Sequence, residues 1–343
     1  MLHKVDFLPD ELFRIVAVDK TNTHHVGTVF RSVYGEDFPV KDVYQPETLW
    51  KEIQARRLVS ALAFDEKGQA AGYISMFKTA PNPRLWEAGN ILVTPEYTHT
   101  NISSRLVHHY FDPAMCKMTD IDGIFNETVC CHFFTQVSAA KIGMIDCGLE
   151  LDQLDGDSFK DGKSNKAGTA RVSCVLYFWE LTDPLEPEYV PIRYDTILRK
   201  IAGSLRPRIL FPSTDALPTD GSTTLEEKYY AYAKTWKVAV PIIGSDWIEV
   251  VENILYKGRE RRVISLQVTL NMACPHIGVA VDLLREKGFF FGGMAPRWFG
   301  TDGLLMQRLL ESETEYEKTK LYKPFSRELL AFIRTDREAV RGI

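Results

Sequence analysis

The chain has 343 residues, of which 45% are hydrophobic and 25% are charged, and it carries a formal net charge of -5. This composition is typical of a globular protein with two domains of ordinary size, and it excludes an intrinsically disordered chain. The net negative charge argues against nucleic acid as a partner, because phosphate binding is driven by clustered lysine and arginine.

The sequence also indicates the cellular compartment of the protein. The first twelve residues carry acids where a secretory signal has its apolar core, and no run of roughly 18 apolar residues is present, so we expect neither secretion nor a membrane span. The six cysteines include one adjacent pair, Cys130 and Cys131, but no CxxC motif. We therefore expect free, buried thiols in a reducing cytoplasm, and no metal site.

The first half of the chain alternates strand-like and helix-like patterns. Two β-prone runs flank a turn at 65–68, which predicts a hairpin, and Pro46 marks the start of a helix. In chain order, the patterns predict a strand at 13–19, helices at 23–34 and 46–57, a hairpin at 59–77, a strand at 85–93, a helix at 102–115, a strand at 123–129, a helix at 133–144, and strands at 147–154 and 170–181. This order predicts a mixed α/β domain over residues 1–182.

A linker and a second domain follow. Residues 183–191 contain three prolines and three acids, which is typical of a linker. Over 192–343, the patterns predict strands, a helix that ends in a glycine turn, and a charged terminal helix. Residues 139–151 and 284–296 share a lysine, then a glycine, an apolar residue and a later glycine at similar spacing. We interpret this similarity as an internal duplication with a diverged second copy.

The short polar segment between the strand at 85–93 and the helix that opens near Asn101 is a candidate ligand site. A helix that begins after a strand leaves backbone N–H groups pointing in one direction, and these donors together with the helix dipole form an anion site. A pyrophosphate fits such a site without any lysine. Many strand–helix turns share this geometry, so the local chemistry alone does not decide the function.

The segment resembles the acyl-CoA-binding motif of the GNAT N-acetyltransferase superfamily. In that family a proline follows the strand, and a turn rich in glycine leads into a helix. The positions that match the family pattern are Val93, Pro95, Tyr97, Ile102 and Leu106. The family arginine and its small residues are replaced here by Thr98, His99, Asn101 and Ser103.

The resemblance implies a tandem GNAT-like α/β fold, in which helices flank a mixed central sheet and the second copy has diverged. It also implies acyl-CoA or acetyl-CoA as the co-substrate, without a metal. The co-substrate would be held by Ile91, Leu92, Val93, Thr98, His99, Thr100, Asn101, Ile102, Ser103 and Ser104. Stretches such as YGEDF and GFFFGGMAPRWFGTDGLLMQRL are similar to bacterial proteins in which a GNAT region is often joined to a histidine-kinase-like ATPase.

Acyl transfer to an amine needs a base that takes the proton of the acceptor ammonium. Glu87 is one candidate, because it lies on the strand before the loop. The alternation of side chains along a strand predicts that Glu87 shares one face with Gly89, Ile91 and Val93. The alternative is a surface or structural carboxylate.

Further candidates come from two other segments. His132 has a reference pKa near roughly 6.5, which suits proton transfer, and Gln136 follows one helical turn later. We predict both as catalytic residues, with a helix cap or a satisfied buried histidine as the alternative. Tyr34, Phe38 and Tyr44 fall in the region that forms the acceptor lid of GNAT folds, where they either bind the acceptor or fill the core.

These observations favour an N-acyltransferase that moves an acyl group from acyl-CoA to a small-molecule or peptide amine by direct transfer. An acyltransferase with an acyl carrier protein as donor is one alternative, because a weakened phosphate loop matters less when the pantetheine arm is held. A non-catalytic acyl-CoA-binding or interaction module is the other, because the glycines of the motif are replaced.

Overall fold

The computed structural model describes residues 13–111, 121–161, 164–165, 168 and 170–341. The chain forms two compact units: unit 1 comprises residues 1–79 and 86–121, and unit 2 comprises residues 80–85 and 122–343. The last four residues of the helix predicted at 102–115 lie outside the described part.

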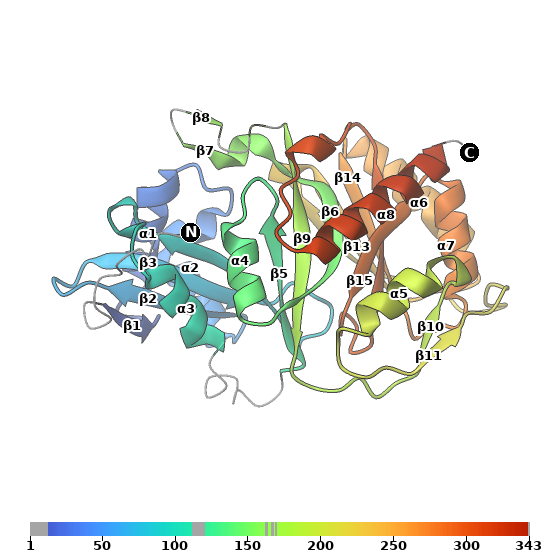
Figure 1. The fold of residues 1–343 in the computed structure, drawn as a ribbon, viewed down its shortest axis with the longest axis horizontal. Coiled ribbons are helices and arrows are strands. Elements are labelled where there is room, and N and C mark those ends of the chain that lie inside the picture. The colour runs from blue at the N-terminus through green and yellow to red at the C-terminus, as the bar shows by residue number, and fades with distance from the viewer. Residues whose placement is uncertain (1–12, 112–120, 162–163, 166–167, 169, 342–343) are drawn as a thin grey trace. The chain divides into compact units, whose positions relative to one another are not determined.

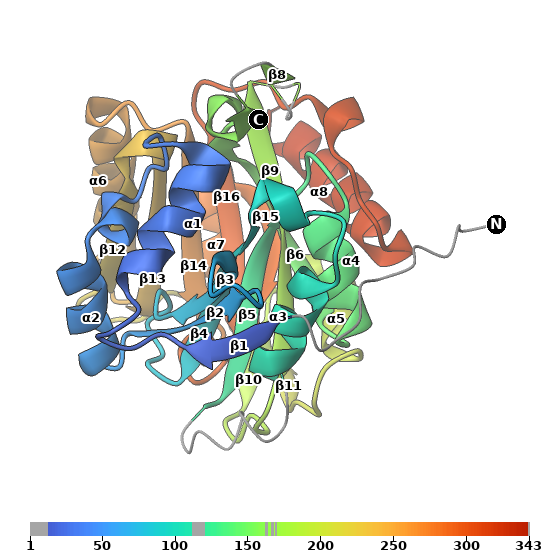
Figure 2. The same cartoon turned by 90° about the vertical axis from the view of Figure 1, so that its left-hand side faces the viewer.

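Unit 1 is an antiparallel sheet with helices on both faces (Figures 1 and 2). Its elements are β1 (Arg14–Ala17), α1 (His24–Tyr34), the short helix η2 (Lys41–Tyr44), α2 (Pro46–Gln54), β2 (Leu58–Phe64), β3 (Ala70–Phe77), β4 (Leu85–Val93), η3 (Pro95–Tyr97) and α3 (Ile102–Phe111). Each strand pairs antiparallel with the next one in the chain. The predicted order of strands and helices is therefore confirmed here.

Adjacent residues of β3 contact the two helix layers of unit 1. Tyr73 packs in the core with Phe30 of α1, and their rings lie 5.5 Å apart. Its neighbour Gly72 faces α3, where a Cβ would come within 2.8 Å of Ile102 Cγ2 and 3.1 Å of Leu106 Cδ1. Successive side chains of a strand point to opposite faces, so α1 and α3 cover opposite faces of the sheet.

Unit 2 contains one large sheet in the order β5-β9-β6-β15-β16-β14-β13-β12. Its elements are β5 (Gly123–Val129), α4 (Phe134–Lys141), β6 (Ile145–Asp155), η4 (Gly156–Phe159), β7 (Lys160–Asp161), β8 (Ser164–Asn165), β9 (Arg171–Glu180), β10 (Glu188–Val190), η5 (Ile192–Tyr194), α5 (Asp195–Ala202), β11 (Leu210–Pro212), β12 (Thr224–Tyr230), η6 (Ala231–Ala233), β13 (Thr235–Ile242), α6 (Trp247–Glu260), β14 (Ser265–Asn271), α7 (Ile277–Glu286), β15 (Phe290–Ala295), β16 (Gly303–Leu309), η7 (Tyr316–Lys318) and α8 (Pro324–Arg341).

The sheet of unit 2 confirms the predicted duplication. The chain runs β5–α4–β6–β9 in the first copy and β14–α7–β15–β16 in the second, and the sheet orders β5-β9-β6 and β14-β16-β15 match. The two copies meet where β6 pairs antiparallel with β15. The second copy has diverged in the segment before β12, where β10 and β11 form a separate parallel pair.

The turns that the sequence comparison aligned are also equivalent in structure. Gly143 and Gly288 both have φ of +82°. In the first turn the N–H groups of residues 143 and 144 donate to the carbonyls of residues 140 and 139. In the second turn the N–H groups of 288 and 289 donate to the carbonyls of 285 and 284. Both helices therefore end in the same glycine-dependent turn before the strand that joins the copies.

The contact between the copies requires glycine. Gly148 of β6 is the register partner of Gly293 of β15. A Cβ on Gly293, whose φ is +139°, would lie 2.2 Å from the Gly148 Cα and 2.5 Å from the Cys147 carbonyl oxygen. Those partners are backbone atoms, so no side chain can move to relieve the overlap.

A buried ionic cluster also connects the two copies. The Arg208 guanidinium binds the carboxylates of Glu180, at the end of β9, and Asp302, before β16, and these side chains are 1%, 3% and 0% exposed. Glu188 of β10 accepts the Asp302 N–H at 2.7 Å. Burial, followed by the neighbouring Asp302 charge, raises the pKa of Glu188 to about 9. One cation thus faces three carboxyl groups, and Glu188 is the one that holds a proton at neutral pH.

The segment predicted as a linker is packed in unit 2, since Glu188 and Val190 are buried. Helix α8, which begins at Pro324, crosses both copies: Ser326 donates to Asp146 of β6, and Asp336 accepts the N–H of Phe291 on β15 (Figure 1). The boundaries of the two compact units differ from the predicted domain boundaries at 182 and 192. The predicted boundaries stay a prediction about where the first copy ends and the second begins.

Within the described residues, no helix combines the length and the apolar character needed to cross a bilayer. The five cysteines that the structure describes are free, and four of them are buried.

We expect Gly293→Ala to lower the free energy of unfolding by about 3 kcal/mol or more, because the new methyl group overlaps the β6 backbone. Gly300→Ala is the matched control, since Gly300 has φ of +87° but nothing within 4 Å of a Cβ. Backbone strain alone should cost about 1 kcal/mol there. Urea unfolding measures both values, and equal losses would show that the β6–β15 overlap has no effect.

We expect Glu188→Gln to stabilise the protein at alkaline pH. The unfolded chain releases this proton near the ordinary glutamate pKa of 4.5, whereas the folded chain keeps it until the pH reaches about 9. The stabilisation from the retained proton is complete below the lower value and is lost as the pH rises through the upper one. The glutamine amide does not ionise and so avoids this loss. Near pH 8 the free energy of unfolding of the variant should therefore exceed that of the original chain by about 1–3 kcal/mol. Denaturant titrations from pH 5 to 9 check this, with the exposed Glu186→Gln as control; a pH-independent difference would contradict it.

Candidate functional site

The end of β4 carries a β-bulge. Leu92 pairs with Tyr73 and Gly89 pairs with Ser75, so two residues of β4, Asn90 and Ile91, stand opposite a single residue of β3. Asn90 has φ of +52°, and its side-chain amide donates to the Ser75 hydroxyl at 3.1 Å. A bulge re-aims the backbone of its strand and is common beside active sites.

The bulge corrects the predicted strand face. Glu87 pairs with Phe77, and Gly89 and Leu92 pair with residues of the same β3 face, so these three β4 residues lie together. Val93 lies on the opposite face. The prediction that Glu87 and Val93 share a face is wrong, because the extra residue at the bulge reverses the alternation of side chains.

Glu87 is half-buried on β4 and accepts a hydrogen bond from the Thr79 hydroxyl at 2.5 Å. The bond orients the carboxylate, and an ionised carboxylate retains further lone pairs for a second donor. The geometry is therefore compatible with both of the roles considered from the sequence.

The loop at 94–101 is tied to the β2–β3 hairpin. The Thr94 N–H donates to the Ala71 carbonyl. The Tyr97 hydroxyl donates to Asp65 at 2.6 Å, and Asp65 also accepts the N–H groups of Lys67 and Gln69 in the hairpin turn. The bond to Asp65 raises the pKa of Tyr97 to about 12. The family-like Tyr97 thus has an anchoring role.

Two threonines shape the start of α3. The Thr98 hydroxyl donates to the Pro95 carbonyl, and the Thr100 hydroxyl donates to the Tyr97 carbonyl at 2.6 Å. The Thr100 oxygen in turn accepts the Ile102 N–H at 3.4 Å. These bonds close the turn, and the first backbone N–H groups of α3 form its positive end.

The predicted co-substrate residues form one strand–loop–helix segment. Ile102 is buried and anchors α3 on the sheet, while His99 and Ser104 are exposed and Ser103 is half-buried. Exposed polar side chains at a helix N-terminus are available to an anionic group. The segment therefore has the form of an anion site whose hydroxyls come from Ser103 and Ser104.

The three aromatic residues predicted to bind the acceptor pack against the core of unit 1. Tyr34 and Phe38 lie 5.1 Å apart, and Phe38 lies 4.7 Å from Phe30. The Tyr44 hydroxyl donates to the Gly35 carbonyl at 2.8 Å. These contacts favour the core-filling alternative, with each of the three predicted side chains partly exposed at the edge of the core.

The other two predicted catalytic residues belong to unit 2. Gln136 is fully buried, and its amide donates to the carbonyls of Val129, His132 and Lys320 while its oxygen accepts the Tyr322 N–H. All its hydrogen-bonding capacity ties α4 to the segment before α8, which is a structural role. Burial, and then the nearby Lys320 charge, lower the pKa of His132. His132 is therefore neutral near pH 7 and can accept a proton.

The counterpart of the loop in the second copy is closed by the chain itself. Between β13 and α6, Asp246 accepts the N–H of Thr223 at 2.7 Å, and Gly244 donates to the Thr223 hydroxyl. A Cβ on Gly244 would lie 2.5 Å from the Ser222 carbonyl carbon. The start of α6 is thus covered by residues 221–223, and the Asp246 carboxylate at its N-cap is bound to the Thr223 N–H.

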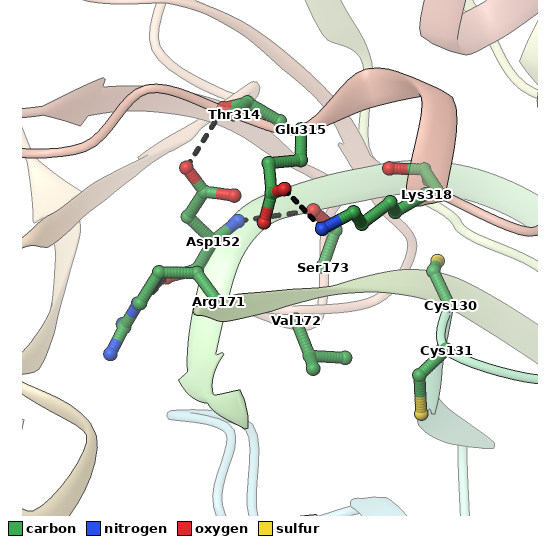
Figure 3. A pocket seen from close by; sticks show the side chains of 10 residues that line it. Cys130, Cys131, Asp152, Arg171, Val172, Ser173, Thr314, Glu315 and Lys318 are labelled. Atoms are coloured by element: carbon green, nitrogen blue, oxygen red, sulfur yellow. Dashed lines mark hydrogen bonds and ion pairs between the residues drawn. The ribbon is translucent and has the colours of Figure 1, made fainter. Parts of the chain in front are cut away.

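A hollow between β6, β9 and the segment at 312–319 is rich in charges (Figure 3). The Asp152 carboxylate accepts the hydroxyls of Ser312 and Thr314, and Glu315 pairs with Lys318 at 2.5 Å. The Arg171 guanidinium donates to three backbone carbonyls. These charged groups are all bound to other groups of the protein, so the hollow has a structural role.

Sequence analysis missed a third charged cluster, formed by Glu127, Glu150 and Lys237. Its members are 87 or more positions apart except for the two glutamates, so no local motif joins them. Within the described part of the chain, no group of three or more His, Cys, Asp or Glu side chains is arranged to hold a metal ion.

No family model and no curated protein matches the chain. Solved structures of acetyltransferases resemble about half of it. An N-acetyltransferase from Staphylococcus aureus Mu50 is 11% identical, with a TM-score of 0.39 over 50% of this chain and 99% of that one. The ribosomal-protein-S5-alanine acetyltransferase from Vibrio fischeri is 14% identical, with a TM-score of 0.39 over 50% and 95%. A putative acetyltransferase from Acinetobacter baylyi ADP1 is 15% identical, with a TM-score of 0.41 over 52% and 96%.

Proposed function

We propose that this chain is an N-acyltransferase that transfers an acyl group from acyl-CoA, such as acetyl-CoA, directly to the nitrogen of an amine. The observation that carries the proposal is the segment from the bulged end of β4 through the tied loop to the start of α3. It supplies backbone donors to an anion and a re-aimed strand next to them, in the order that the sequence resemblance implies.

In this proposal the pyrophosphate of the co-substrate lies at the N-terminus of α3, where the backbone N–H groups and the helix dipole favour negative charge. Ser103 and Ser104 add hydroxyl donors. Backbone amides at the end of β4 stabilise the oxyanion that forms on the thioester carbonyl. The amine nitrogen then forms the new C–N bond, the C–S bond breaks, and the CoA thiolate leaves.

The amine must lose a proton before or during attack, and Glu87 is our first candidate for its acceptor. His132 of unit 2 is neutral near pH 7, and its role in catalysis stays a prediction from the sequence. We assign Gln136 no chemical step, since its amide is fully engaged. The acceptor is a small-molecule or peptide amine.

A carrier-protein donor is the second candidate for the same chemistry. Thr98 and His99 stand in the loop where the family has an arginine and a glycine, and Thr98 uses its hydroxyl inside the turn. A loop with fewer hydrogen-bond donors to a pyrophosphate favours an acyl donor that is held mainly by its pantetheine arm. Turnover with acyl-pantetheine equal to that with acyl-CoA would support the carrier-protein donor.

We expect CoA and acyl-CoA to bind with micromolar affinity and Ser104→Glu to weaken that binding by about tenfold or more, through charge repulsion at the pyrophosphate. His108→Glu is the matched control, because it adds the same charge to an exposed position in the last turns of α3. Calorimetric titrations with CoA, acetyl-CoA and longer acyl-CoAs measure the affinities. Absence of binding to every donor at millimolar concentration would contradict the function.

We expect Glu87→Gln to lower kcat by about 10- to 100-fold, because the amide cannot take a proton, while the KM for acyl-CoA stays the same. The exposed Glu96→Gln in the neighbouring loop is the control. Thiol release with a panel of primary amines measures both constants. An unchanged kcat for Glu87→Gln would leave Glu87 with only the structural role.

A further inference from the structure

The charged cluster that sequence analysis missed joins both copies within unit 2. The Lys237 ammonium of β13 lies 2.5 Å from Glu127 of β5 and 2.7 Å from Glu150 of β6. Gln153, also on β6, donates its amide to Glu127. These four side chains form what we call the Glu127 cluster.

The Glu127 cluster has more acceptors than donors. Glu150 and Gln153 are 3% and 4% exposed, yet Glu150 Oε2 and Gln153 Oε1 have no hydrogen-bond partner among the described residues. Both of these atoms are acceptors when Glu150 is ionised. When both glutamates are ionised, two carboxylates against one ammonium also leave a net negative charge. Buried acceptors without donors are costly, so the site favours a group that supplies N–H bonds and positive charge.

The cluster lies on a face of the strands that α4 and α6 leave uncovered. Asn126, the neighbour of Glu127, contacts Met144 at the end of α4, and Trp236, the neighbour of Lys237, packs against the end of α6. Successive side chains alternate, so Glu127 and Lys237 point away from those helices. Their side chains are 16% and 15% exposed, so the outer edge of the cluster reaches the surface of the protein.

We propose that the Glu127 cluster binds the ammonium group of a cationic ligand, with Glu127, Glu150 and Gln153 as its acceptors. This inference rests on the proposed function in naming that ligand as an amine acceptor that carries a protonated nitrogen. The class of ligand follows from the cluster itself: an alkylammonium has three donors and one positive charge, which match the orphaned acceptors and the excess carboxylate.

Glu150 of the cluster binds a proton. Burial, and then the charge of Glu127, raise the pKa of Glu150 to about 8, while both carboxylates hold the pKa of Lys237 well above its usual value. Tyr230 of β12 and Cys174 of β9 are the other titratable groups beside the cluster. At neutral pH, Glu150 therefore holds a proton, while Gln153 Oε1 still lacks a donor. An entering ammonium replaces the Glu150 proton, so binding should release up to one proton and strengthen as the pH rises toward about 8.

The test is calorimetric titration of the full chain, without acyl-CoA, with methylammonium, butylammonium and 1,4-diaminobutane at about pH 7. Methanol, butanol and 1,4-butanediol serve as uncharged analogues. Two buffers that differ in ionisation enthalpy report the released proton. Glu127→Gln and Glu150→Gln are the variants, and Asp146→Asn is the matched control, since Asp146 is a buried acid of β6 that binds Ser326 and Lys323 instead. Circular dichroism and urea unfolding of each variant verify that it is folded.

We expect at least one of the three ammonium probes to bind with proton release, and both Glu→Gln variants to weaken that binding about tenfold or more, while Asp146→Asn and the alcohols show no such effect. Absence of binding by all three ammonium probes at about 100 mM, or binding that neither Glu→Gln variant changes, would overturn the inference. The failure of the proposed function is distinguishable, because it would appear as absent CoA binding while the ammonium titrations remain positive.

Discussion

The close approach of β6 and β15 at Gly148 and Gly293 is the constraint on which unit 2 depends. The two strands belong to different copies of the same strand–helix motif, and their backbones come nearer than any side chain allows. This approach makes one sheet out of two shorter ones, which would otherwise each have an unpaired edge. It also fixes the register between the copies, because only one pair of opposed residues lacks a Cβ on both sides.

Polar groups from distant parts of the chain gather around that joint. Arg208 lies among three carboxyl groups, and Lys237 lies between two. Buried ions contribute little net stability when a well-packed apolar alternative exists, but an unmatched partner is strongly destabilising. Such clusters therefore favour one arrangement of the copies over others. Helix α8 adds to this by bonding Asp146 in one copy and Phe291 in the other.

The sequence predicted the order of elements, the equivalent glycine turns and the duplication, because periodicity and glycine positions are local signals. It did not predict the bulge at Asn90 and Ile91, since the extra residue is defined only by the pairing with β3. Gln136 was predicted as a catalytic residue because two of its partners, the backbone groups of residues 320 and 322, are 184 and 186 positions away. The Glu127 cluster was hidden for the same reason. Local patterns thus place the candidate loop, but they do not show which polar side chains the fold has already satisfied.

The closed loop of the second copy behaves as a bound ligand that is part of the chain. Residues 221–223 cover the start of α6, and the Asp246 carboxylate at its N-cap accepts the Thr223 N–H. A tethered group acts at an effective concentration in the millimolar range or above, and a site that it fills responds little to dilute competitors. The duplication has therefore produced two helix N-termini with different surroundings, one open to the medium and one covered by its own chain. On the proposed function we accordingly expect one acyl-CoA per chain, although the fold contains the motif twice.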